Sequence, residues 1–551
     1  MKKIFILSLF SLLLFSGCND LDIAPKNLIT DKDLIGSESG MDIYMARMYS
    51  NMPFEDFKYM AKWGFDFNSW LGAFGIEGTG EAVGRDNICK SFTGEDTQYW
   101  GKSFPLLRDA NFLIENLPKY EGNFAGNVYN HYMGEAYFVR AFVFYTMAKR
   151  YGGVPLVTRV IQYPADESTL EVPRSSEKET WNQVLSDFDT AISLLSNKPL
   201  KDGYSSKYIA LAFKSEAMLY AGSVAKYNET VQGRLTGLGR KTGVRVIGFD
   251  ESQWEDASKK YFTEAYKAAR EVMINGGYDL YKKKWAANDK EAQYQNMVDM
   301  FEMADGRAIK DAGADYDDQN PYVNRDPRFY YDILYNGVKW GNNKGVPHYF
   351  ELWEYNTYDN SKSADMMALF SQTYNPRCPY LIRKWWPETA NKWENDYNYY
   401  MPAIYIRVAQ LYLDFAEAAN EAYGPETKVP GTDMSAVDAI NIIRNRVGAV
   451  PVRNEYKANK EIFRERIRNE RAVELCFEDH RWYDIRRWRI AKDAVKVIYK
   501  AVITRTGKDQ FRFEYMEHPD YKRVFEDKHY WYPIPKSQME MLNNVEQNPG
   551  W

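Results

Sequence analysis

The sequence predicts an all-α fold, in which amphipathic helices stack into a scaffold interrupted by one loop-rich lobe with little regular structure. Segments in both halves of the chain place apolar residues at alternating spacings of three and four, which is the spacing of one helix face. Between about 275 and 400 this spacing gives way to Gly, Asn, Asp, Pro and aromatic residues, which favour turns and loops. We therefore expect a single domain over residues 18–551, with the helical scaffold at about 19–274 and 401–551 and the lobe at about 275–400.

The first 17 residues predict a lipoprotein signal peptide. Lys2 and Lys3 precede an apolar run over residues 4–16, which is shorter than the roughly 20 residues that a membrane-spanning helix needs. Small residues, Ser16 and Gly17, come directly before Cys18, as a signal peptidase requires. We expect the mature chain to begin at an acylated Cys18. The alternative is plain secretion, with Cys18 as an ordinary thiol.

Seven long segments of the chain are expected to be helical. They lie at about 131–150, 177–196, 206–223, 254–274, 402–423, 434–447 and 460–479. Small side chains recur on their faces, as at Ala217, Ala221 and Gly222, and would let neighbouring helices come close, as in stacked helix pairs of the tetratricopeptide kind. Because the helices start at uneven intervals, we expect a degenerate tetratricopeptide-like helical repeat.

The segment 402–423 has the clearest helical pattern. Its apolar residues form two neighbouring stripes, which together make a wide apolar face, while Arg407, Asp414 and Glu417 share the remaining face. This helix should therefore be packed between neighbours and end at Gly424 and Pro425.

Composition excludes some functions. The net charge of -5 argues against a nucleic-acid partner, which is held by clustered Lys and Arg. Besides Cys18 the chain has Cys89, Cys378 and Cys476, an odd number that cannot form a disulfide framework, although one bridge or three buried thiols both remain open.

Catalytic signatures are scarce. The five histidines are far apart in sequence, and zinc-protease, serine-hydrolase and phosphate-loop motifs are missing. The glycine-rich segment 78–84 resembles a dinucleotide loop only superficially and is better interpreted as a surface loop. We expect no enzyme activity and no cofactor, although a pair of carboxylates for glycoside hydrolysis could be present in any acidic chain.

Four aspartates in the lobe could supply oxygen ligands for calcium. Asp311, Asp315, Asp317 and Asp318 lie close in sequence, but the spacing of an EF-hand and its closing glutamate are missing. A solvated acidic loop is favoured, and no metal site is predicted.

The densest group of charges lies at 469–488. Glu470 and Glu474 fall on an otherwise apolar helix stripe, where carboxylates must be paired. The nearest cations in sequence are Arg466, Arg471, Arg481, Arg486 and Arg487. This many nearby cations should keep the pKa of a carboxyl group from being raised, as a catalytic acid would need. Structural ion pairing is therefore favoured over catalysis.

At this group of charges the chain resembles the SusD/RagB family of outer-membrane nutrient-binding lipoproteins. The matching residues of the late helix are Glu470, Arg471, Glu474, Leu475, Glu478, Arg481, Asp484, Arg487 and Trp488, with Asp479 where the family usually has glycine and Ile485 where it has leucine. Further matches occur at 134–136, 140–141, 151–156, 325–329, 416–418, 532–535 and 547–551.

The resemblance implies a tetratricopeptide-like scaffold, no catalysis, and a SusC-like TonB-dependent barrel as partner. It implies a lipoprotein anchored in the outer membrane through Cys18 and facing the cell exterior, and the acidic residues that follow Cys18 resemble the export tag of Bacteroidetes surface lipoproteins. Its cargo would be a glycan, or alternatively a peptide. Relatives usually carry a longer segment before the sequence that resembles residues 301–306, which puts borrowed ligand contacts in doubt.

Aromatic residues make up 16% of the chain and suit a glycan, because sugar rings pack on aromatic faces while their hydroxyls need polar partners. Because long irregular stretches often bind ligands, we expect the site in the lobe and in residues 60–100. The candidate residues are Trp63, Asp66, Asn68, Trp70, Arg85, Asp86, Asn87, Trp353, Tyr355 and Tyr358. Each single aromatic residue could instead be packed in the core.

Overall fold

We describe the fold from a computed structural model of the chain. The structure describes residues 30–52, 97–162, 171–228, 237–281, 295–343, 346–369, 379–384, 404–518, 523–541 and 543–551, together with Thr79 and the short strands at 58–60, 64–66, 82–83 and 292–293. Cys18, Cys89 and Cys378 lie outside the described residues, whereas Cys476 is buried and its thiol donates a hydrogen bond to Asp332 Oδ2 at 3.6 Å.

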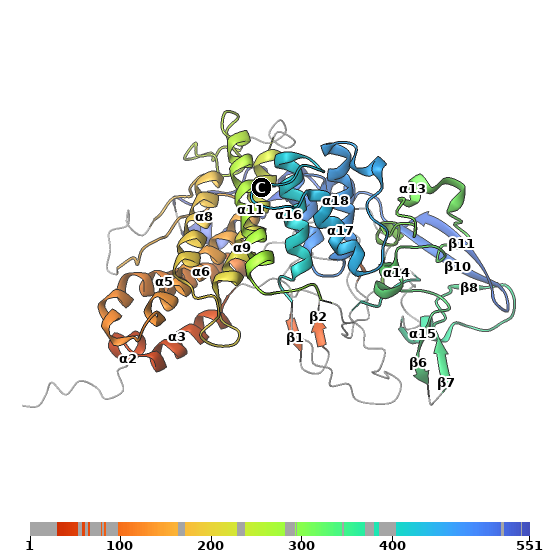
Figure 1. Cartoon of the computed structure of the whole chain (residues 1–551), viewed down its shortest axis with the longest axis horizontal. Helices are drawn as coiled ribbons and strands as arrows, with labels where there is room; N and C mark the ends of the chain where they lie inside the picture. Colours follow the sequence, from red (N-terminus) through yellow and green to blue (C-terminus); the bar gives the residue numbers. More distant parts are fainter. Residues whose placement is uncertain are drawn as a thin grey trace, which may run out of the picture.

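Helices form most of the regular structure (Figure 1). The N-terminal half contains α2 (Asp31–Ile35), α3 (Glu38–Ser50), α5 (Thr97–Asn116), the 3-10 helix η1 (Leu117–Asn123), α6 (Val128–Tyr151), α8 (Glu177–Leu194), α9 (Lys207–Lys226) and α11 (Trp254–Asn275). The C-terminal half contains α16 (Val408–Tyr423), α17 (Ala436–Arg446), η3 (Asn454–Lys457), α18 (Lys460–Glu474), α19 (His480–Arg487), α20 (Ala491–Ala494), η4 (Asp527–Tyr530) and α21 (Lys536–Met541).

The long helices pack in sequence order as a helical scaffold. Contacts join α5 to α6, α6 to α8, α8 to α9, α9 to α11, and α11 to α16, which then packs on α17 and α18. Figure 1 shows this row running from the red and orange helices to the blue ones. The arrangement confirms the predicted all-α, tetratricopeptide-like scaffold. Among the described helices, none combines the length and hydropathy that crossing a bilayer requires.

Local sequence explains where several helices begin. Ser176 and Ser435 each accept a hydrogen bond from the third residue of the following helix, and the Glu179 and Asp438 carboxylates bond back to the cap backbone. Ser206 caps α9 in the same way through its hydroxyl.

Two helix boundaries differ from the prediction by more than one helical turn. The helix expected at 402–423 begins at Val408, because Arg407 is extended and its guanidinium is held by Glu474 and Glu478. The helix expected at 460–479 ends at Glu474, because Phe477 and Asp479 have positive φ values. At Asp479, φ is 62°, which explains why relatives have glycine there.

Small side chains set the distance between α9 and α11, as the sequence indicated. A Cβ atom added at Gly222 would lie 2.9 Å from the ring of Phe262, which is buried. We expect Gly222→Ala to lower the free energy of unfolding by about 1–2 kcal/mol, because overpacking outweighs the gain in helix propensity. Chemical denaturation followed by circular dichroism measures this change in the free energy of unfolding.

The matched control is Gly101→Ala in α5, where an added Cβ meets no atom within 4 Å. This substitution should stabilise the chain by up to about 1 kcal/mol. Equal stabilisation of both variants would contradict the close packing at Gly222.

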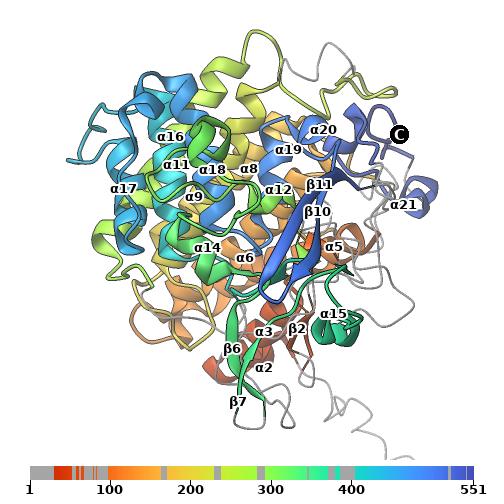
Figure 2. The ribbon, with the colours of Figure 1, turned by 90° about the vertical axis from the view of Figure 1, so that its right-hand side faces the viewer.

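The lobe lies beside α17 and α18 at the end of the helix row (Figure 1), and it holds most of the strands, several of which face the viewer in Figure 2. Its helical turns are α12 (Gln295–Val298), α13 (Ile309–Ala312), η2 (Gly313–Asp315), α14 (Pro327–Asp332) and α15 (Ala364–Leu369). The strands are β1 (Lys58–Met60), β2 (Gly64–Asp66), β3 (Ala82–Val83), β4 (Ala292–Gln293), β5 (Ile333–Leu334), β6 (Lys339–Asn343), β7 (Val346–Tyr349), β8 (Tyr355–Asn356), β9 (Leu381–Ile382), β10 (Tyr499–Gly507) and β11 (Gln510–Glu517).

These strands form four small sheets. β1 pairs with β2, β6 with β7, and the order of the others is β3-β4-β9-β5 and β11-β10-β8. All pairs are antiparallel except β10 with β8. Residues 499–517 were expected to belong to the helical scaffold at 401–551, but they form the β10–β11 hairpin, which pairs with β8 in the lobe.

The lobe has its own hydrophobic core. Phe301, Phe329, Leu352 and Tyr380 are buried together with Phe477 from the turn after α18. The scaffold has a separate and larger core. The lobe is therefore a packed unit, which contacts the scaffold at the end of α18.

Candidate functional site

The charged residues that match the family pattern form an ion-pair network, which we call the ion-pair junction. Glu470 on α18 is fully buried, and its two oxygens lie 2.5 Å from Arg328 Nη1 and 2.8 Å from Arg444 Nη1. Arg328 belongs to α14 and Arg444 to α17. The junction therefore connects the lobe to two scaffold helices.

A second carboxylate, Glu474, sits one turn further along α18. It lies 2.7 Å from Arg407 Nη1 and 2.7 Å from Arg446 Nη2. Burial alone would raise the pKa of Glu470 and of Glu474, but the surrounding guanidinium groups outweigh it and lower each pKa to about 2. Both groups are thus ionised at neutral pH, unlike a carboxyl that acts as a general acid.

The rest of the pattern extends the same junction. Arg471 pairs with Asp414 and Asp484, and Arg487 pairs with Glu417 and Asp484. Ion pairing is confirmed as the role of this group of charges, but most partners of Glu470 and Glu474 come from other elements and not from the neighbouring arginines that were expected. Of those, Arg466 lies 3.9 Å from Glu470.

The structure describes only part of the predicted ligand-binding group. Trp63, Asn68, Trp70, Arg85, Asp86 and Asn87 lie outside the described residues, and Asp66 is described only as the backbone end of β2. The remaining three residues, Trp353, Tyr355 and Tyr358, lie together at the β8 edge of the lobe sheet.

These three residues differ in exposure. Trp353 is 4% exposed and packs against Ile503 and Phe513, so its ring faces the lobe core and not an open surface. Tyr355 and Tyr358 are 59% and 53% exposed, and the Arg505 guanidinium lies 5.4 Å from the Tyr358 ring centre. Only the two tyrosines offer an accessible aromatic face.

The acidic loop contains ion pairs and hydrogen bonds. Asp315 lies 2.6 Å from Arg307, and Asp311 accepts a hydrogen bond from the Tyr456 hydroxyl. Within the described ranges, no group of three or more metal-ligating side chains is gathered.

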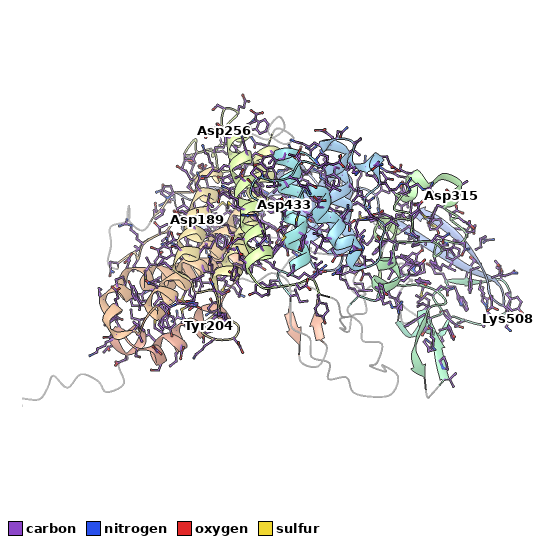
Figure 3. The ribbon with its side chains drawn as sticks, in the orientation of Figure 1. Asp189, Tyr204, Asp256, Asp315, Asp433 and Lys508 are labelled. Atoms are coloured by element: carbon purple, nitrogen blue, oxygen red, sulfur yellow. The ribbon has the colours of Figure 1, made fainter. Side chains whose placement is uncertain are left out.

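A cavity of about 800 Å³ opens on the helical scaffold, and we call it the tyrosine groove. Its walls come from the end of α3, the loop 195–206 with the start of α9, residues 278–281 after α11, and residues 404–411 at the start of α16. Six tyrosines line it: Tyr49, Tyr204, Tyr208, Tyr278, Tyr281 and Tyr405. Figure 3 labels Tyr204 at the lower edge of the scaffold.

Four tyrosines of the groove pack against each other in pairs. The rings of Tyr49 and Tyr204 stack with centroids 4.8 Å apart and an interplanar angle of 11°. Tyr208 and Tyr278 meet edge to face, with centroids 6.5 Å apart. Half of the Tyr278 side chain is exposed, so its ring can be reached from solvent.

The lining of the groove combines buried apolar side chains with exposed carboxylates. Phe138, Phe213 and Leu411 are buried, whereas Asp202 and Asp279 are exposed. Flat aromatic faces next to carboxylates and hydroxyls can pack on a sugar ring and bond its hydroxyl groups.

This groove was not predicted from the sequence. Its tyrosines are spread over residues 49–405 and meet only through the packing of α3, α9, α11 and α16. The one available signal was Tyr405, at the edge of the segment that was predicted to be a helix with a wide apolar face.

Comparisons with known proteins agree on one family. A family model described as "SusD family" matches residues 286–551, and one described as "Starch-binding associating with outer membrane" matches residues 27–219. SusD-like protein P2 of Formosa agariphila is 23% identical over 517 residues, which cover 90% of this chain and 92% of the relative. SusD-like protein P38 of the same organism is 27% identical over 220 residues, covering 39% of this chain and 41% of that protein.

Solved structures share the fold. A SusD-like protein from Bacteroides fragilis superposes with a TM-score of 0.65 at 22% identity, covering 96% of this chain and all of the other. A SusD-like carbohydrate-binding protein from the same species superposes with a TM-score of 0.64 at 18% identity, and the match covers 93% of this chain and 99% of that protein.

Proposed function

This chain belongs to the SusD family, and from that premise we propose that it binds an extracellular glycan and delivers it to a SusC-like TonB-dependent transporter. In this proposal the protein is anchored in the outer membrane through an acylated Cys18, faces the cell exterior, and does not change its cargo chemically.

The observation that carries the glycan proposal is the tyrosine groove. Its volume of about 800 Å³ lies within the range of small-molecule sites, and its aromatic faces are open to solvent at Tyr278. The ionised carboxylates of the ion-pair junction are occupied by arginines, which supports a binding role over hydrolysis.

Isothermal titration of the chain without residues 1–18 against neutral, acidic and amino glycans tests the proposal. We expect saturable heat with at least one glycan and no release of reducing ends on incubation. Binding of peptides alone would change the assignment to peptide uptake. Release of reducing ends that one carboxylate substitution abolishes would replace it with a glycoside hydrolase.

A further inference from the structure

Beneath one wall of the tyrosine groove lies a pair of buried ionisable side chains. His131 and Glu135 are one turn apart on α6, and both side chains are fully buried, with 3.7 Å between His131 Nε2 and Glu135 Oε1. Within the described part of the chain, His131 Nε2 and Glu135 Oε2 have no hydrogen-bond partner. Leaving such groups buried costs free energy, so their position calls for an explanation.

Both ends of the loop 195–206 are attached to this pair. At the start of the loop, the Ser196 backbone N–H donates to His131 Nδ1 at 3.2 Å. At its end, the Ser205 backbone N–H donates to the Tyr49 hydroxyl at 2.8 Å, and that hydroxyl donates to Glu135 Oε1 at 3.3 Å.

The loop is a wall of the groove. It contributes Asp202, Tyr204 and Ser205 to the lining, and the Tyr204 ring stacks on Tyr49. Gly134, next to Glu135, lets the loop approach α6 closely, because an added Cβ would lie 3.0 Å from the Leu195 backbone nitrogen. The position of this wall thus depends on α6.

The bond from Ser196 sets the protonation state of His131. Because Nδ1 accepts a hydrogen, the imidazole is neutral and carries its proton on Nε2, which points toward Glu135. A doubly protonated imidazole would carry a second N–H at Nδ1, directed at the N–H of Ser196. Two donors cannot bond each other, so this attachment would be lost.

Other charged and titratable groups surround the pair. Asp42 and Tyr49 come from α3, Tyr132 from α6, and Lys201 and Tyr204 from the loop. Asp42 is paired with Lys201 at 2.5 Å. Glu38, also on α3, acts electrostatically on Tyr132. Burial raises the pKa of Glu135, an effect that His131 and Tyr49 oppose and Asp42 reinforces.

We propose that His131 and Glu135 are positioning residues that hold the loop 195–206 as a wall of the tyrosine groove, and that protonation of His131 releases the loop and weakens ligand binding. Only the ligand-binding consequence rests on the proposed function, since the attachment of the loop is a property of the free protein.

Hydrogen–deuterium exchange of the loop peptide tests this without a ligand. After correction for the intrinsic rate, exchange over 195–206 should rise by about fivefold or more between pH 7.5 and pH 5, the change expected for loss of one buried hydrogen bond. His131→Asn keeps an acceptor near the place of Nδ1 and cannot be protonated, so its loop should exchange equally at both pH values.

His348→Asn is the matched control, because His348 also faces a carboxylate, Asp365 at 3.1 Å, but lies in the lobe. It should keep the pH response of the unsubstituted protein. Equal loop exchange of the unsubstituted protein at both pH values, or a persisting response in His131→Asn, would overturn the proposal. A glycan that binds in the titration should bind more weakly at pH 5 than at pH 7.5. If no glycan binds, the exchange experiment alone still decides whether protonation of His131 releases the loop.

Discussion

Replacing Glu470 by glutamine is expected to lower the free energy of unfolding by about 3–5 kcal/mol, because it leaves two buried arginines without their shared carboxylate. Arg328 and Arg444 are 3% and 1% exposed and cannot reach water for compensation. The amide nitrogen of glutamine would also face one guanidinium as a donor against a donor. Urea denaturation followed by circular dichroism gives the change in stability.

The same substitution should loosen the lobe first. Glu470 makes the shorter of the two ion pairs that connect α18 to Arg328 of α14, and Glu474 makes the other at 3.2 Å, so the substitution weakens the connection between the two elements. Limited proteolysis should therefore cut faster within residues 295–384 than in the helices of the scaffold.

Glu465→Gln is the matched control on the same helix. Glu465 pairs with Arg468 at 2.7 Å, but its side chain is 68% exposed, so its loss should change stability by no more than about 1 kcal/mol. If Glu470→Gln and Glu465→Gln lowered the free energy of unfolding by the same small amount, the ion-pair junction would not hold the lobe on the scaffold.

The scaffold could be predicted from the sequence because helix periodicity is a local signal. The segment expected at 177–196 is observed as Glu177–Leu194, and the one at 254–274 as Trp254–Asn275. Helix α5 was not predicted, because it contains Pro105 in its interior, and proline normally argues against a helix. The β10–β11 hairpin was missed because four successive residues of β10, 501–504, are buried and do not alternate.

The partners of the buried carboxylates could be predicted only in part. Periodicity identified Glu470 and Glu474 as buried charges that need cations, and this is confirmed. It could not identify Arg328, which is 142 residues away from Glu470 in the chain. Neighbours in sequence were chosen because the pattern of one helix contains no information about the helices that pack on it.

The candidate site was the least predictable part. Residue type alone suggested Trp353, but the packing of β10 and β11 encloses its ring. An aromatic residue that binds a ligand and one that fills a core have the same sequence pattern, and only the surrounding elements distinguish them. The groove itself is formed by four separated segments, so no single stretch of sequence could indicate it.

Paired substitutions test whether the glycan binds in the tyrosine groove or on the lobe. Replacing both Tyr204 and Tyr278 by alanine should weaken glycan binding by about thirtyfold or more, corresponding to about 2 kcal/mol, because aromatic anchors in a pocket carry much of the binding energy. Titration of a glycan that binds the unsubstituted chain measures this loss. Tyr204→Phe with Tyr278→Phe keeps the rings and should retain most of the affinity.

The control pair is Tyr355→Ala with Tyr358→Ala, which removes two exposed rings from the lobe. If the groove is the binding site, this pair should leave the affinity within about threefold of the unsubstituted value, a difference of less than 1 kcal/mol. The opposite result would place the glycan on the lobe, where the sequence predicted it. Equal losses would mean that one extended ligand reaches both surfaces, since the two pairs of rings share no element of the fold.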